Sequence, residues 1–171
     1  MTSTYHVPVM LNASLEALHI DGYGARTGQW MDATFGGGGH SHAILERLGP
    51  EARLFGFDQD PDAAKNALVD ARFTLVAANF RFAPQFLRAH GALPLTGILA
   101  DLGVSSHQFD TPERGFSLRH DGPLDMRMNV QSGQPAHAWL ATVEVRELTQ
   151  VLRKYGELTR PDRLAHRIVA A

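Results

Sequence analysis

The chain has 171 residues, which is enough for one domain, or for one domain and part of a second. Apolar residues make up 44% of it and charged residues 20%, proportions that exclude a disordered or fibrous protein. The absence of cysteine excludes disulfides and thiolate sites and fits a reducing cytoplasm, and a net charge of −2 gives no general attraction to nucleic acid. No segment resembles a signal peptide or a membrane span, so we expect a cytoplasmic protein with no membrane partner.

Strand-like and helix-like segments alternate over the first hundred residues. The predicted strands are residues 29–35, 52–58, 73–80 and 96–102. The predicted helices between them are residues 41–48, 60–71 and 81–91. Asp60 is placed to cap the second helix, with Pro61 in its first turn, whereas Pro84 weakens the third. This alternation is typical of an α/β fold, in which helices cover both faces of a parallel sheet.

The pattern changes after Leu102. Residues 103–135 contain turn-forming residues throughout and predict a long ordered loop, and helical segments follow at 136–143, 145–158 and 161–171. Residues 1–111 hold seven Lys/Arg and eleven Asp/Glu (net −4), whereas residues 112–171 hold nine and seven (net +2). The C-terminal part is therefore the better candidate for a phosphate-facing surface, although on charge alone a solvated face of mixed charge explains the balance better.

Four consecutive glycines, residues 36–39, lie between the first predicted strand and the first helix. Ligands of open parallel sheets bind at the carboxyl ends of the strands, where backbone N–H groups and a helix N-terminus favour anionic groups. Asp58 ends the second strand, twenty residues after Gly38, where a carboxylate can accept both hydroxyls of a ribose. The pattern indicates an adenosine-containing cofactor, and the alternative is a structural turn.

Two common cofactor loops do not match. A dinucleotide fingerprint, G-x-G-x-x-G, requires a third glycine at residue 41 or 42, depending on which glycine the count starts from, but Ser41 and His42 stand there. A P-loop requires a lysine directly after its last glycine, but no lysine occurs before Lys65. S-adenosylmethionine needs backbone room and a ribose carboxylate but has no pyrophosphate. It is therefore the cofactor that suits the glycine loop best.

Several unusual strings occur in a fixed order along the chain. They are "HVPVML" (6–11), "DATFGGGGHS" (32–41), "FDQDP" (57–61), "NF" (79–80), "GILADLGVSS" (97–106), "RGFS" (114–117), "GPLDMRMN" (122–129), "YGE" (155–157) and "HRIVAA" (166–171). Together they resemble the ribosomal RNA small subunit methyltransferase H family. The resemblance implies a Rossmann-like class I methyltransferase core with an inserted helical subdomain. Both parts are incomplete here, because the family's chains are nearly twice as long.

The resemblance also implies a function. Members of the family methylate the exocyclic amine of a cytidine in the decoding region of small-subunit ribosomal RNA, so we expect this RNA, in the assembled or assembling subunit, as the partner. The core would be residues 1–111, and the partial loop and helical insert for substrate recognition would be residues 112–171. The competing interpretations are a truncated, non-catalytic cofactor- or RNA-binding fragment and, more distantly, an NAD-dependent dehydrogenase. The oligomeric state is left open.

The family's site residues carry over to named positions. The cofactor contacts would be Gly38, Gly39, His40, Asp58, Phe80, Asp101 and Gln108. Asp101 is also the candidate catalytic residue, as an acceptor beside the cytosine amine, and its alternative role is to cap a loop. By itself Phe80 is better explained as a core residue. His40 and His42 have a spacing that a metal can use, but no third ligand is evident, so no metal is expected.

Four residues of the long loop have two interpretations. Arg114 and Arg119 are candidates for phosphate contact, and Asp125 and Arg127 for shaping a base pocket. Without the resemblance, ion pairs within the loop explain all four at least as well.

Overall fold

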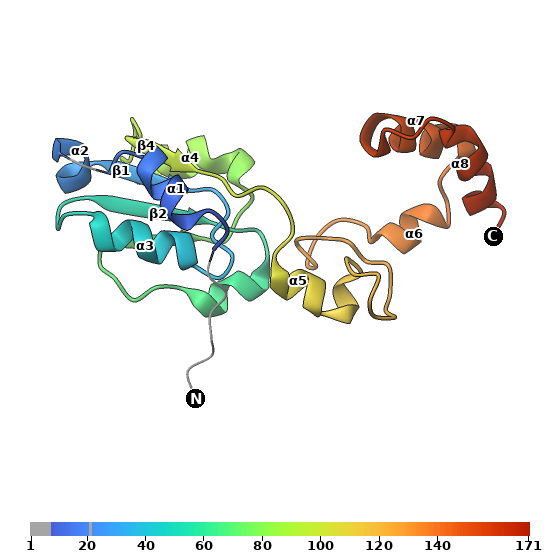
Figure 1. Ribbon diagram of the computed structural model, residues 1–171, viewed down its shortest axis with the longest axis horizontal. Coiled ribbons are helices and arrows are strands. Elements are labelled where there is room, and N and C mark those ends of the chain that lie inside the picture. Colours follow the sequence, from blue (N-terminus) through green and yellow to red (C-terminus); the bar gives the residue numbers. More distant parts are fainter. Residues whose placement is uncertain (1–7, 21) are drawn as a thin grey trace. The chain divides into compact units, whose positions relative to one another are not determined.

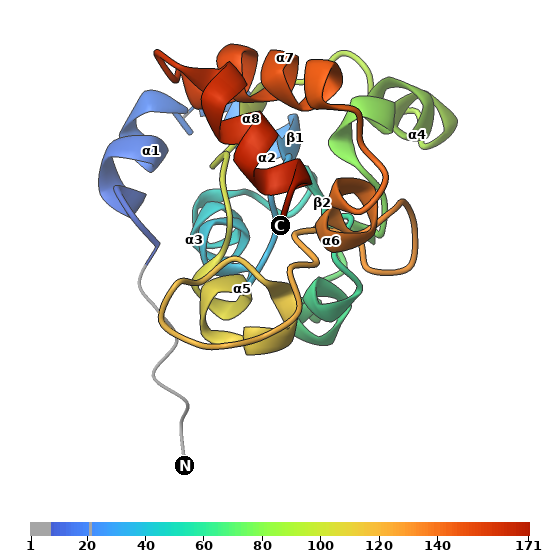
Figure 2. The same ribbon diagram turned by 90° about the vertical axis from the view of Figure 1, so that its right-hand side faces the viewer.

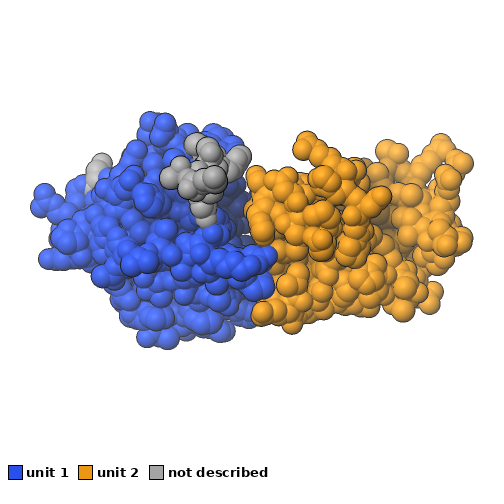
Figure 3. All heavy atoms as spheres, turned by 90° about the horizontal axis from the view of Figure 1, so that it is seen from below, with its two compact units in different colours: residues 1–103 blue, residues 104–171 orange. Residues whose placement is uncertain are grey.

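The computed structural model describes residues 8–20 and 22–171. The first two residues of the "HVPVML" string, 6 and 7, lie outside the described residues. The chain divides into two compact units, residues 1–103 and residues 104–171 (Figure 3). The sequence predicts a functional boundary after residue 111, between a cofactor-binding part and a substrate-recognition part. This boundary stays a prediction.

The first unit contains a four-stranded, fully parallel sheet (Figure 1). Its strands are β1 (Gln29–Asp32), β2 (Arg53–Phe57), β3 (Phe73–Val76) and β4 (Gly97–Leu99). Their order is β3-β2-β1-β4, so the chain proceeds outward from β1 to β3 and then crosses back over β1 to form β4. The reversal places the topological switch point of the sheet between β1 and β4.

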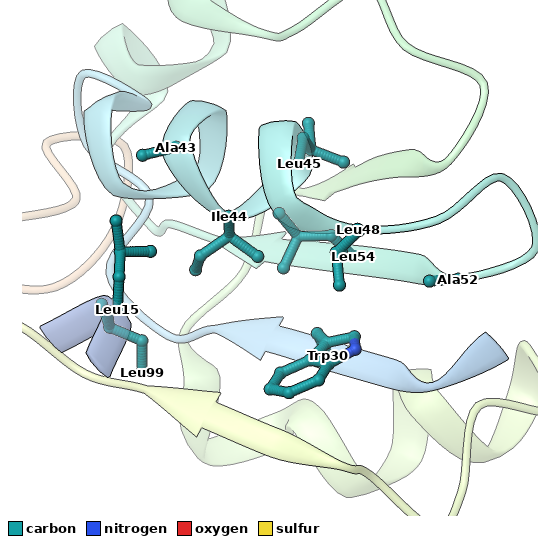
Figure 4. Packing of buried hydrophobic residues seen from close by; sticks show 9 residues of the cluster. All are labelled: Leu15, Trp30, Ala43, Ile44, Leu45, Leu48, Ala52, Leu54 and Leu99. Atoms are coloured by element: carbon teal, nitrogen blue, oxygen red, sulfur yellow. The ribbon is translucent and has the colours of Figure 1, made fainter. Parts of the chain in front are cut away.

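Helices cover both faces of this sheet, because successive strand residues point to opposite faces. The helices are α1 (Leu11–Ala17), α2 (Gly22–Thr27), α3 (Gly39–Arg47) and α4 (Ala83–Ala89). On one face, Trp30 and Leu54 pack with Leu15 of α1 and with Ile44 and Leu48 at α3 (Figure 4). On the other face, a second cluster joins the strands to α4, and its members are Met31, Ala33, Phe55, Phe57, Val76, Ala83, Leu87 and Ala92. The predicted α/β fold is confirmed, and it is consistent with a Rossmann-like core.

The strands end earlier than predicted. Residues 33–35, 77–79 and 100–102 lie in loops beyond the strand ends, and the predicted site residue Asp101 is among them.

The helix predicted at 60–71 is wrong beyond Asn66. Asp60 does act as a cap, since its carboxylate accepts a hydrogen bond from the Asp62 N–H at 3.0 Å, but the helix is a short 3-10 helix, Pro61–Asn66. Asn66 donates its side-chain amide to the Gly36 carbonyl, and Leu68 packs against the core. These tertiary contacts outweigh the local helical preference of residues 67–71.

The second unit is helical. After α5 (Ser106–Asp110) and a 3-10 helix (Pro112–Arg114) come α6 (Ala136–Leu140), α7 (Val145–Gly156) and α8 (Pro161–Val169). α7 and α8 lie side by side (Figure 1 and Figure 2) and bury Val143, Leu148 and Ala165. In the described part of the chain, no helix is long and apolar enough to cross a membrane.

The prediction of an uninterrupted loop over 103–135 missed α5. Ser105 accepts a hydrogen bond from the Gln108 N–H, and the Gln108 side chain accepts one from the Ser105 N–H. The S-x-x-Q pattern of this capping box was the available signal.

Candidate functional site

The predicted site residues of the first unit follow the carboxyl ends of all four strands. The glycines come after β1, Asp58 after β2, Phe80 after β3 and Asp101 after β4. Because the strands are parallel, these ends lie along one edge of the sheet, and the β1 and β4 ends flank the switch point. The sequence prediction that these residues share one edge is therefore supported by the topology.

The glycine loop is shaped partly by the protein's own packing. Gly36 and Gly38 have φ angles of +50° and +79°, which residues with a side chain rarely adopt. A Cβ atom at Gly38 would lie 3.0 Å from the Phe35 ring, and one at Gly39 would lie 2.5 Å from Cγ of Pro8. Internal contacts therefore explain part of the glycine run, and the close approach of a ligand stays a prediction.

Asp58 is tied to the glycine loop. Its Oδ2 accepts a hydrogen bond from the Gly36 N–H at 2.7 Å, and its Oδ1 accepts one from the Asp60 N–H at 2.8 Å. A carboxylate oxygen can accept more than one hydrogen bond. The half-buried carboxylate therefore keeps the capacity to accept the two hydroxyls of a ribose.

His40 lies in the first turn of α3 and is only 7% exposed. Its Nε2 atom has no hydrogen-bond partner among the described residues. A buried polar atom of this kind is costly unless a ligand or water pairs with it, so it fits a ligand-binding position. The described residues contain no group of three or more His, Asp or Glu that is suitable for a metal.

Asp32, at the end of β1, is a buried carboxylate that the sequence analysis did not single out. Its Oδ2 accepts a hydrogen bond from the Ser41 hydroxyl at 2.7 Å, and its Oδ1 accepts one from the Thr34 N–H at 3.0 Å. Burial raises the pKa of this carboxyl group above its ordinary value, although the hydrogen bonds oppose the change. The available signal was an acidic residue at the end of an otherwise buried strand.

Asp101 has an exposed side chain. Its backbone N–H donates to the Thr34 hydroxyl oxygen at 2.8 Å, which joins the loop after β4 to the loop after β1. Asp101 is therefore held next to the glycine loop by its backbone.

Phe80 begins a 3-10 helix, Phe80–Phe82, directly after the loop that follows β3. Asn79 donates its side-chain amide to the Gln59 side chain at 2.9 Å, and this contact brings the loop after β3 to the loop after β2. Phe80 is 42% exposed, so the alternative interpretation as a core residue is wrong.

Gln108 belongs to the second unit, and its described contacts are those of the α5 capping box. Its assignment to the cofactor stays a prediction.

The loop residues Arg114 and Arg127 have structural roles. Arg114 is buried and donates to the carbonyl oxygens of Arg127 and Met128, both at 3.0 Å, so it is not available for phosphate. The Arg127 guanidinium hydrogen-bonds Asp125, with a shortest distance of 2.7 Å, and lowers the pKa of Asp125 to about 2. The predicted ion pair within the loop is confirmed for Asp125 and Arg127, whereas Arg114 donates to backbone carbonyls and Arg119 is exposed.

The second unit has a shallow groove beside α7 and α8. It is lined by Glu144, Val145, Arg146, Thr149, Gln150, Arg153 and His166. Arg146 and Arg153 are exposed and form no ion pair within the described part of the chain. The groove therefore carries two guanidinium groups without an ion-pair partner among the described residues, and one carboxylate, that of Glu144, also lines it.

Residues 3–171 match the model of the MraW methylase family. The chain belongs to this family. Among the proteins similar to this chain are several named ribosomal RNA small subunit methyltransferase H. The protein of Flavobacterium johnsoniae is 53% identical over 100% of this chain and 56% of its own length. Those of Porphyromonas gingivalis and Phocaeicola vulgatus are 52% and 51% identical, over 98% of this chain and 53% and 54% of their own lengths. The chain thus spans about half the length of these curated relatives.

Proposed function

We propose that this chain is the cofactor-binding part of an S-adenosylmethionine-dependent methyltransferase. Its substrate would be small-subunit ribosomal RNA, in the assembled or assembling subunit, and its target the exocyclic amine of a cytidine in the decoding region. One observation carries the proposal: hydrogen bonds join Asp58 and Asp101 to the loop after β1, at the switch point of the sheet. The names of the similar proteins support the RNA substrate.

The residues at the sheet edge fit the cofactor. Asp58 would accept the ribose hydroxyls, the backbone of Gly38 and Gly39 would face the cofactor, and His40 would offer its unpartnered Nε2. The exposed Phe80 ring would cover the adenine. When bound, S-adenosylmethionine supplies an electrophilic methyl group.

Asp101 would act on the acceptor. The cytosine amine is a poor nucleophile because its lone pair is delocalised into the ring. A carboxylate that accepts a hydrogen bond from this amine orients it and stabilises the positive charge that develops on nitrogen as the methyl group is transferred. The exposed Asp101 carboxylate, anchored through its backbone, suits this task.

Calorimetric titration with S-adenosylmethionine and with NAD tests the cofactor. We expect the chain to bind S-adenosylmethionine and not NAD, whereas binding of NAD and not of S-adenosylmethionine would support the NAD-dependent dehydrogenase. Transfer of tritiated methyl groups to unmethylated small subunits tests the activity. Cofactor binding without transfer would favour the non-catalytic fragment.

The α7–α8 groove is the surface that we propose for the RNA backbone, since exposed arginines contact phosphates. Arg146→Gln with Arg153→Gln should weaken RNA binding and reduce the slope of log K against log salt by about 1.5, because two phosphate contacts are lost. Arg160→Gln with Arg163→Gln removes the same charge from exposed positions that do not line the groove. Filter binding over a range of salt concentrations measures both double variants. Equal losses of RNA affinity in the two would show that overall charge, and not the groove, causes the effect.

A further inference from the structure

Three hydrogen bonds connect the first turn of α3 to the backbone that follows β4. The Ser41 hydroxyl donates to Oδ2 of Asp32 at 2.7 Å, and Oδ1 of Asp32 accepts the Thr34 N–H at 3.0 Å. The Thr34 hydroxyl oxygen then accepts the Asp101 N–H at 2.8 Å. Thr34 thus stands between a buried carboxylate and the candidate catalytic residue.

The two ends of this connection differ in how firmly they are held. Asp32 and Ser41 are both 0% exposed, so the first end belongs to the rigid core. At the other end, Asp101 and its neighbours Leu102 and Gly103 are exposed, and β4 is an edge strand of three residues. Among the described residues, the backbone of 100–104 makes no other hydrogen bond. The Thr34 hydroxyl is therefore the anchor of this segment.

We infer that Thr34 is a positioning residue, whose hydroxyl holds Asp101 at a set distance from the glycine loop. This inference rests on the proposed function, because it concerns the geometry between cofactor loop and acceptor residue. Without the hydroxyl, the Asp101 backbone loses its partner, and its exposed carboxylate samples positions away from the cofactor. The loop after β1 would then no longer fix the position of the segment that follows β4.

Thr34→Val tests the inference, because valine has nearly the shape of threonine but cannot accept a hydrogen bond. In amide hydrogen exchange followed by NMR, the Asp101 amide should exchange about tenfold faster in this variant, as expected for the loss of one hydrogen bond. Thr34→Ser retains the hydroxyl and should restore slow exchange. The Ala33 amide, which donates to the Leu99 carbonyl at 2.8 Å, reports whether β1 and β4 remain together.

Cofactor affinity supplies the second readout. Because Asp101 is also a predicted cofactor contact, Thr34→Val and Asp101→Asn should each weaken S-adenosylmethionine binding in calorimetry. The double variant should bind no more weakly than the worse single variant. Additive losses would show that Thr34 does not act through Asp101. An unchanged Asp101 exchange rate in Thr34→Val, or a serine variant as impaired as the valine variant, would also overturn the inference. If the unaltered chain binds no S-adenosylmethionine, the proposed function fails, and the exchange rates alone still decide whether Thr34 holds Asp101.

Discussion

Asp58 combines a structural contact with its proposed contact to the ribose. Asp58→Ala should weaken binding of S-adenosylmethionine at least tenfold, since hydrogen bonds to a charged group contribute about 1.5–3 kcal/mol each. The variant also frees the Gly36 N–H, which loosens the loop. Calorimetry measures the affinity, and Glu51→Ala, which removes an exposed carboxylate in a turn, is the control. Unchanged affinity in Asp58→Ala would remove Asp58 from the site.

Asp32 makes the stability of the first unit depend on pH. Burial raises its pKa above 3.8, so the folded chain binds this proton more tightly than the unfolded chain does. The free energy of unfolding therefore falls as the pH rises above about 4 toward the folded-state pKa. The amide side chain of the Asp32→Asn variant does not ionise. The free energy of unfolding of this variant should therefore rise relative to that of the unaltered chain as the pH rises.

Urea denaturation at about pH 4 and about pH 8 measures this difference. Asp70 has the opposite dependence and acts below this range, because its hydrogen bonds with Arg72 lower its pKa to about 2, so it does not contribute to the difference between the two pH values. The stability that Asp70 contributes is present above pH 3.8 and is lost as the pH falls toward 2. If the stability of Asp32→Asn follows that of the unaltered chain at both pH values, Asp32 does not titrate as described.

At the scale of elements, the start of α3 depends on a contact with Pro8. A Cβ atom at Gly39 would lie 2.5 Å from Cγ and 3.1 Å from Cδ of Pro8, but 3.9 Å from its Cβ. Gly39→Ala should therefore destabilise the chain by about 1–3 kcal/mol through overpacking, and Pro8→Ala, which removes Cγ and Cδ, should relieve most of this cost in the double variant.

Thermal or urea unfolding of the two single variants and the double variant gives the coupling free energy. The same set separates packing from ligand contact. If the double variant is stable and still does not bind S-adenosylmethionine, the glycine is needed for the cofactor; if it binds normally, the glycine is needed only for Pro8. A Gly39→Ala variant with unchanged stability would contradict the contact.

At the scale of the whole molecule, we expect the outer edge of β4 to promote self-association. In the described part of the chain β4 pairs with β1 alone, and Ile98 on this edge strand is 58% exposed. Unpaired edges with apolar side chains promote pairing between chains, and a charge on the edge prevents it. Sedimentation should show an average mass that rises with concentration, and Ile98→Lys should abolish the rise.

Val69→Lys is the matched control for this prediction. Val69 is fully exposed and lies outside the strands, so the same added charge should leave association unchanged. Association that persists in Ile98→Lys, or is lost equally in both variants, would show that β4 is not the contact.

The sequence by itself determined the family, the α/β class and the approximate place of each strand, because apolar alternation, glycine runs and caps such as Asp60 are local signals. The tertiary structure decided how the site is held together. Thr34 meets Asp101 across 67 residues because β4 returns beside β1, and Gly39 meets Pro8 because Pro8 packs on the first turn of α3. Arg114 turned inward for a similar reason, to satisfy carbonyls more than ten residues away. Such contacts depend on strand order and on the burial of polar groups, which no short stretch of sequence encodes.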